Sequence, residues 1–150
     1  MSHTYHMLLY HLVWSTKNRC PFIIKSYQDR LYRYMGGTFR SLKCHPVQVG
    51  GMPDHIHALV SIPPNVTISE IVRNAKVSTN NWMSQTFPET KSFAWQKGYG
   101  AFSVSPSNSN AVITYIQNQE THHKKSDFKE EFIALLNKHG ITFDEKYLWK

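Results

Sequence analysis

The sequence predicts an α+β fold of the ferredoxin-like type, in which a βαββαβ chain forms one antiparallel sheet with helices on one face and additional C-terminal helices. Apolar runs at 6–15, 45–63 and 100–105 are typical of strands, and helical periodicity fills the stretches between them. A hydrophobic content of 41%, with 13% aromatic residues, is enough for one packed core. We therefore expect a single domain, 1–150.

The first half of the chain is expected to supply three strands and one helix. "HMLLYHLVWS" at 6–15 is too apolar for an edge, which places it centrally in the sheet. Ser26 can cap a helix that runs to about Lys43. "HPVQVGGM" at 45–52 and "HIHALVSIP" at 55–63 then form two antiparallel strands, joined by a turn at Pro53 and Asp54.

The second half begins with the most regular helical pattern of the chain. Thr67 and Glu70 form a capping box. Six apolar positions after Thr67 fall at helical spacing: Ile68, Ile71, Val72, Ala75, Trp82 and Met83. A strand at 100–105 follows, and Ser107 or Asn108 can cap a helix through "NAVITYIQNQETHH". A last amphipathic helix is expected at about 127–139.

The charge and composition indicate which kinds of partner the protein can bind. Seventeen Lys and Arg against ten Asp and Glu give a net charge of +7, which favours polyanions, nucleic acid first, although a merely solvated basic surface is the alternative. Cys20 and Cys44 are too few for a disulfide framework and are expected to be reduced. No apolar run approaches a membrane span and the start resembles no signal peptide, so we expect a cytoplasmic protein without a membrane partner.

Two histidines open the predicted strand at 55–63. His55 and His57 flank Ile56, and because side chains alternate along a strand, both imidazoles face one way. Two half-buried histidines with ordinary hydrogen-bond partners would give the same pattern, and a metal site is the alternative.

A tyrosine and a glutamine follow at helical spacing in "TYIQNQETHHK". Tyr115 and Gln119 lie one turn apart, so the Gln119 oxygen could join the two imidazoles as a third metal ligand while the Tyr115 phenol reaches the same phosphate. A Gln oxygen and a phosphate favour a hard divalent cation, Mg²⁺ or Mn²⁺. Read alone, Tyr115 is an ordinary tyrosine at the edge of the core. His123 could supplement Gln119, but His122 and His123 are first expected as cations near a helix C-terminus.

Four blocks in this order, "YHLVWSTKNR", "MPDHIHALVSIPP", "WQKGYGAFSVS" and "YIQNQ", resemble the HUH single-tyrosine transposases of insertion sequences and repetitive extragenic palindromes. The resemblance covers about residues 5–125. It implies that His55, His57 and Gln119 bind the metal and that Tyr115 is the nucleophile. It further implies cleavage and rejoining of hairpin-bearing single-stranded DNA through a 5′-phosphotyrosine intermediate, and a homodimer, although some palindrome-associated members act as monomers.

DNA-contacting residues are predicted less directly. Lys17 and Arg19 follow the first strand and can hold phosphates. On the helix after Thr67, Arg73 and Lys76 are expected on a solvated face. Trp95, Tyr99 and Phe102 could stack on unpaired bases, with core packing the stronger expectation for Phe102.

Two other functions stay open at this stage. A non-catalytic single-stranded nucleic-acid-binding module would use the same fold and charge, with structural histidines. A metal-dependent phosphohydrolase would use water and have no need of Tyr115. No G-x-x-x-x-G-K-[ST] loop is present, so we expect no nucleotide cofactor.

Overall fold

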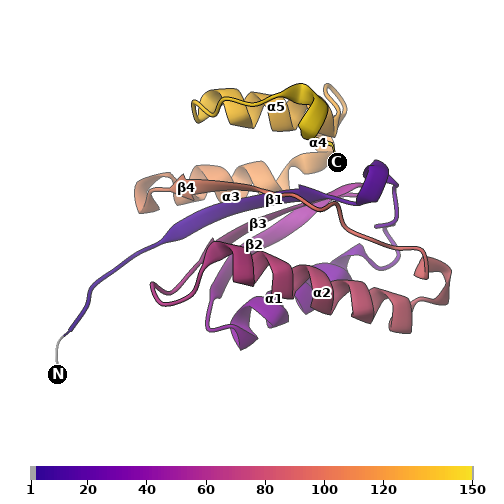
Figure 1. The fold of residues 1–150 in the computed structure, drawn as a ribbon, viewed down its shortest axis with the longest axis horizontal. Helices are drawn as coiled ribbons and strands as arrows, with labels where there is room; N and C mark the ends of the chain where they lie inside the picture. Colours follow the sequence, from indigo (N-terminus) through magenta and orange to yellow (C-terminus); the bar gives the residue numbers. More distant parts are fainter. Residues whose placement is uncertain (1–2, 150) are drawn as a thin grey trace.

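A computed structural model describes residues 3–149 and contains one four-stranded antiparallel sheet with helices on both sides (Figure 1). The strands lie in the order β2-β3-β1-β4. In chain order the main elements are β1 (Leu9–Ser15), α1 (Gln28–Ser41), β2 (His45–Met52), β3 (His55–Ser61), α2 (Ile68–Thr86), β4 (Gly100–Val104), α3 (Ser109–Gln117), α4 (Gln119–His123) and α5 (Phe128–Lys138). The predicted βαββαβ order and the central position of β1 are confirmed.

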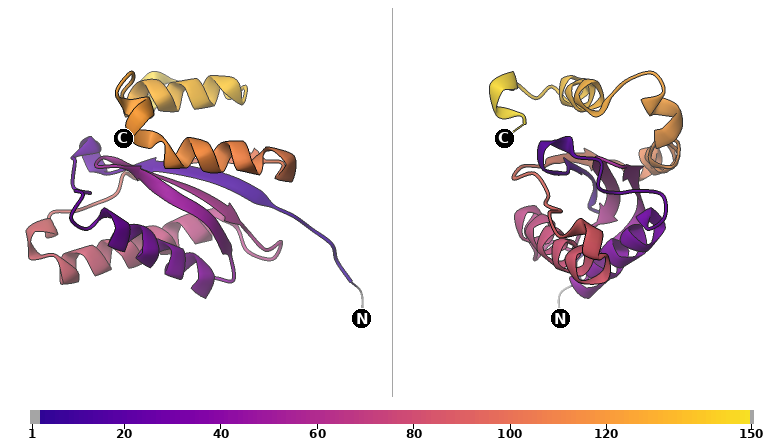
Figure 2. Two further views of the ribbon diagram at one scale, coloured as in Figure 1. Left: turned by 180° about the vertical axis from the view of Figure 1, so that it is seen from behind. Right: turned by 90° about the vertical axis from the view of Figure 1, so that its right-hand side faces the viewer.

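The two helices of the βαββαβ unit, α1 and α2, pack together on one face of the sheet, as expected (Figure 1). The additional helices α3 and α5 cover the opposite face, and the end-on view in Figure 2 shows the sheet between the two layers. The sheet is therefore covered on both sides, which agrees with the apolar character of its central strands.

One helix boundary follows the predicted capping and two depart from the prediction. The hydroxyl of Thr67 accepts a hydrogen bond from the Glu70 amide at 3.2 Å, so the predicted cap of α2 is confirmed. Helix α1 begins at Gln28 with Tyr27 in the N-cap position, so Ser26 does not cap it. The Tyr27 hydroxyl donates instead to the Phe22 carbonyl. The predicted helix through 123 is divided at 118 into α3 and α4.

Side chains of β1 and β3 alternate between two cores. Toward α1 and α2 point Leu12, Trp14, Ile56, Ala58 and Val60, which belong to the larger cluster. Toward α3 and α5 point Leu9, Val13 and Leu59, together with three histidines, His11, His55 and His57. The histidines are thus buried inside the second layer.

Two glycines of β2 allow the close approaches that shape this second layer. A Cβ at Gly50 would lie 3.0 Å from Ile116 Cγ2 and 3.2 Å from the Ile116 carbonyl oxygen, so Gly50 lets α3 pack tightly on β2. A Cβ at Gly51 would lie 2.2 Å from the His55 carbonyl oxygen. Glycine is required there for the tight turn that leads into β3.

Two further expectations can be compared with the structure. Cys20 and Cys44 are free thiols, as predicted. Within residues 3–149 no helix is both long enough and apolar enough to cross a membrane.

Candidate active site

The histidine pair begins β3 and faces the layer formed by α3, α4 and α5. His55 pairs with Ser15 of β1 and His57 with Val13, so both residues lie on one inner strand of the sheet. Both side chains are 0% exposed. The prediction that both imidazoles face one way is confirmed, and they are fully buried.

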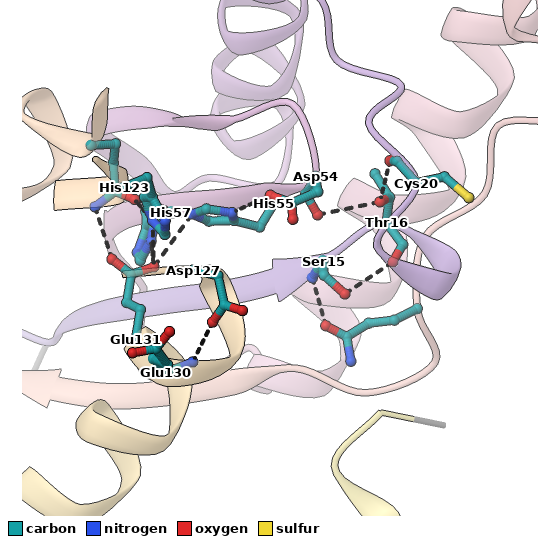
Figure 3. Close-up of polar contacts among 12 residues, drawn as sticks. Ser15, Thr16, Cys20, Asp54, His55, His57, His123, Asp127, Glu130 and Glu131 are labelled. Carbon is teal, nitrogen blue, oxygen red and sulfur yellow. Dashed lines mark hydrogen bonds and ion pairs between the residues drawn. The ribbon is translucent and has the colours of Figure 1, made fainter. Parts of the chain in front are cut away.

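The two imidazoles converge on a carboxylate that the sequence analysis did not single out. Oε1 of Glu131, on α5, lies 3.0 Å from His57 Nε2 and 3.3 Å from His55 Nε2, and His123 Nε2 approaches the same oxygen at 3.3 Å (Figure 3). One donor atom from each of His55, His57 and Glu131 lies within 4.8 Å of the others. Two imidazole nitrogens and a carboxylate oxygen at this spacing fit a divalent cation.

Gln119 joins the same cluster. Its Oε1 lies 3.0 Å from His55 Nε2 and 3.1 Å from His123 Nε2, and its amide donates to Glu131 Oε2 at 3.2 Å. The side chain of Gln119 is 2% exposed. The structure therefore brings together the three residues predicted as metal ligands and adds His123 and Glu131 to them.

The outward nitrogens of the pair are held by two further side chains. His55 Nδ1 lies 2.7 Å from Asp54 Oδ1, and His57 Nδ1 lies 2.8 Å from His11 Nε2. A histidine whose Nδ1–H donates to a carboxylate, as that of His55 does to Asp54, directs its Nε2 toward a metal. Asp54 and His11 thus fix the orientation of both imidazoles.

Burial and charge set the protonation of the cluster in opposite directions. Burial alone would lower the pKa of His55, but hydrogen bonds with Asp54 and Glu131 raise it from 6.5 to about 9. Burial lowers the pKa of His57, and burial together with the nearby His57 lowers the pKa of His11 to about 3. The pKa of Glu131 falls below its usual range despite burial, because His55 and His57 stabilise the carboxylate.

Tyr115 lies beside the cluster on α3. Its hydroxyl donates to Glu131 Oε2, and its ring lies edge-on to His57 with centroids 5.6 Å apart. Burial and the adjacent Glu131 charge raise the pKa of the phenol above 10. Tyr115 and Gln119 stay neighbours across the helix break, since the Gln119 amide donates to the Tyr115 carbonyl at 3.3 Å.

Helix α5 brings Glu131 into the site by packing its apolar side on the sheet. Phe128, Phe132 and Leu136 form a cluster with Val13 of β1 and Phe102 of β4. A signal for Glu131 was present in the sequence, because it occupies the same helical stripe as these apolar residues. A carboxylate on an apolar stripe is rarely buried without a partner.

The remaining predicted contacts lie at the edge of the site or away from it. Lys17 is exposed and Arg19 half-buried in a short 3₁₀ turn, Lys17–Arg19, directly after β1. This turn lies next to the turn at Pro53 and Asp54 that precedes His55, because the Thr16 amide donates to the Asp54 carbonyl at 2.9 Å. Phe102 is buried in the core, as expected.

A family model described as "Transposase IS200 like" matches residues 4–119, well over half of the chain. The chain belongs to this transposase family. The resemblance seen in the sequence is thereby confirmed, and the family is one of enzymes that cut and transfer DNA strands.

Relatives and solved structures agree with this placement. The chain is 25% identical over 119 residues to the ISDra2 transposase TnpA of Deinococcus radiodurans, spanning 76% of this chain and 85% of that protein. A crystal structure of a Deinococcus radiodurans R1 protein assigned as a transposase matches with a TM-score of 0.66 and 26% identity, over 79% of this chain and 95% of the other.

A second solved structure is a REP-associated tyrosine transposase bound to a REP hairpin. It matches with a TM-score of 0.60 and 15% identity, over 82% of this chain and 74% of that one. At this identity the likeness concerns the fold.

Proposed function

We propose that this transposase cleaves and rejoins single-stranded DNA at hairpin-bearing ends, with Tyr115 as the nucleophile and a 5′-phosphotyrosine intermediate. One observation carries the proposal. One oxygen of the Glu131 carboxylate accepts a hydrogen bond from the Tyr115 hydroxyl, and its other oxygen contacts the Nε2 atoms of His55 and His57. The phenol and the candidate metal ligands are thus close enough to act on one phosphate.

His55, His57 and Gln119 would hold the divalent cation, Mg²⁺ or Mn²⁺, with Glu131 as a further oxygen ligand. The bound cation would polarise the scissile phosphate and offset the charge that develops on its oxygens. Asp54 and His11 would keep the imidazole Nε2 atoms directed at it.

The reaction exchanges one phosphodiester for another. The Tyr115 oxygen forms a bond to phosphorus, the bond from phosphorus to the 3′-oxygen breaks, and the 3′-oxygen leaves as a hydroxyl after taking a proton. Because its pKa is raised, Tyr115 is protonated near neutral pH, and the acceptor nearest to its proton is the Glu131 carboxylate. No ATP is required.

The resemblance also predicts the setting of the reaction. We propose a homodimer that acts on DNA in the cytoplasm, with Lys17 and Arg19 holding backbone phosphates. In this chain the Tyr115 ring lies beside His57 of the same subunit.

Covalent capture tests the proposed nucleophile. Single strands from both flanks of the gene, incubated with the protein and Mn²⁺, should give a protein–DNA adduct that survives denaturation. Tyr115→Phe should bind the same DNA, form no adduct and lose about 1–3 kcal/mol of stability with its charged hydrogen bond. Tyr34→Phe, on α1, should behave as wild type.

The other functions predict different results. Cleavage that persists in Tyr115→Phe would indicate a hydrolase that uses water. Tight DNA binding without cleavage of any flanking strand would indicate a binding module.

A further inference from the structure

A second concave site lies on the other side of the sheet from the histidines. A pocket of about 510 Å³ lies between α2 and the segment 94–99 that leads into β4. Its lining includes three cations, Arg73, Lys76 and Lys97, and no carboxylate. The same pocket is lined by apolar and aromatic surface from Val72, Val77, Trp95 and Tyr99. Arg73 and Lys76 therefore border a concave site, whereas the sequence analysis expected a plain solvated face.

Lys76 shapes this pocket. Its Nζ donates to the carbonyl oxygens of Gln96 and Gly98, both at 2.8 Å, and so holds the segment 94–99 against α2. Burial lowers the pKa of Lys76 from 10.5 to about 8. Across residues 3–149 the ion pairs formed do not include Lys76, so backbone carbonyls and the faces of Trp14 and Tyr99, whose ring centroids lie 5.7 and 5.8 Å from Nζ, stabilise its charge.

Other groups at the pocket are available to a ligand. Tyr99 is 38% exposed and Val77 is 56% exposed, so both present apolar surface to a ligand. Arg73 and Lys97 are exposed and make no ion pair within the described part of the chain. The Asn80 carboxamide oxygen is buried and has no hydrogen-bond partner among those residues.

We propose that this pocket binds one unpaired nucleotide of the DNA strand on which the enzyme acts. The base lies against Tyr99 and Val77, its edge donates to Asn80, and Arg73 and Lys97 bind the adjoining phosphates. An aromatic ring beside a cationic rim is the usual platform for single-stranded nucleic acid. The volume is ample for one nucleotide.

The pocket is connected through the end of β1 to the cluster of His55, His57 and Glu131. The Lys17 amide donates to the Ala94 carbonyl at 2.8 Å, and the Gln96 amide donates to the Ser15 carbonyl at 2.9 Å. Thr16 in turn contacts the Asp54 turn that precedes His55 (Figure 3). A single strand that occupies both sites would pass over this end of the sheet, where Lys17 lies.

This inference rests on the proposed function, so its test uses binding alone. Fluorescence anisotropy with labelled dT15, in EDTA, measures affinity without cleavage. Tyr99→Ala should weaken binding about 5- to 100-fold, the range for loss of one stacked base. Arg73→Gln and Lys97→Gln should each lower the slope of log affinity against log salt by roughly 0.7.

Matched controls come from α1. Tyr34 is 37% exposed, like Tyr99, and Arg33 is an exposed arginine on a helix, like Arg73. Tyr34→Ala and Arg33→Gln should keep wild-type affinity and salt dependence. Thermal unfolding of every variant checks that the fold is intact.

A second ligand isolates the base. An abasic 15-mer should bind wild type and Tyr99→Ala equally, because it has no base to stack. Equal loss on dT15 and the abasic strand, or equal binding of a 15-base-pair duplex, would mean a basic surface only and would overturn the proposal. So would wild-type affinity of the Tyr99 and Arg73 variants for dT15.

The two proposals fail separately. If DNA becomes attached to Tyr115 but the pocket variants bind dT15 like wild type, the nucleotide pocket is refuted and the proposed transposase chemistry is supported. Impaired dT15 binding by the pocket variants, without any adduct in wild type, would support the pocket and remove the chemistry.

Discussion

Glu131→Gln is the most informative single change, because it removes one negative charge from the point where three imidazoles meet and keeps the shape of the side chain. The wild-type carboxylate is 7% exposed and contacts His55, His57 and His123. Removing one partner of a buried ion pair typically costs about 3 kcal/mol or more. We therefore expect the metal-free variant to be less stable than wild type by about 3 kcal/mol at pH 6.

The loss of stability in Glu131→Gln should become smaller as the pH rises. The pKa of His55 is raised in the folded state, from 6.5 to about 9, so the stability it contributes is fully present below pH 6.5 and is lost as the pH rises through 9. A pKa difference of about 2.5 corresponds to about 3 kcal/mol. In Glu131→Gln, the hydrogen bond from His55 to Asp54 keeps part of this contribution. The difference in stability between wild type and Glu131→Gln should therefore become smaller toward pH 10, but it should not disappear.

Urea unfolding of both proteins in EDTA, at pH 6, 8 and 10, measures this gap. Glu130→Gln is the matched control, because it removes the same charge from an exposed neighbour on α5 and should leave stability within about 0.5 kcal/mol. Saturating Mn²⁺ at about 100 times its Kd should stabilise wild type by about 2.7 kcal/mol, and the variant by less at the same concentration. A gap that does not change with pH, or a control that matches Glu131→Gln, would refute this account of the cluster.

Two further substitutions test residues that position the side chains of the site. His11→Phe removes the hydrogen-bond partner of His57 Nδ1 and should weaken Mn²⁺ binding about 10- to 100-fold by calorimetry, with partial recovery in His11→Gln. Undiminished affinity would show that His11 does not support the site. Gly50→Ala places a methyl group 3.0 Å from Ile116 Cγ2 and should cost about 1–3 kcal/mol of stability and reduce adduct formation. Gly37→Ala, in open space on α1, should be neutral or stabilising, and equal losses in both variants would contradict the packing argument.

Much of the fold could be predicted from the sequence because it depends on interactions between residues close together in the chain. The Thr67 cap, the helical stripe of α2 and the two-residue alternation around Ile56 are properties of adjacent residues, and each appears in the structure as predicted. The division at Asn118 of the helix predicted through "NAVITYIQNQETHH" could not be predicted from the sequence. No proline or glycine marks the position, yet Asn118 takes a backbone conformation outside the helix, with φ −98° and ψ 26°.

The candidate site divides in the same way. The sequence by itself determined that His55 and His57 share a face and that Tyr115 lies one turn from Gln119, because both follow from backbone periodicity. Only the tertiary structure decided that Glu131 joins them, 74 residues after His57, and that His11 supports them from β1. The position of α5 depends on how Phe128 and Phe132 pack against Val13 and Phe102, and strand register decides which β1 residue meets His57. Such contacts between distant segments are set by the packing of the whole chain, which no local pattern contains.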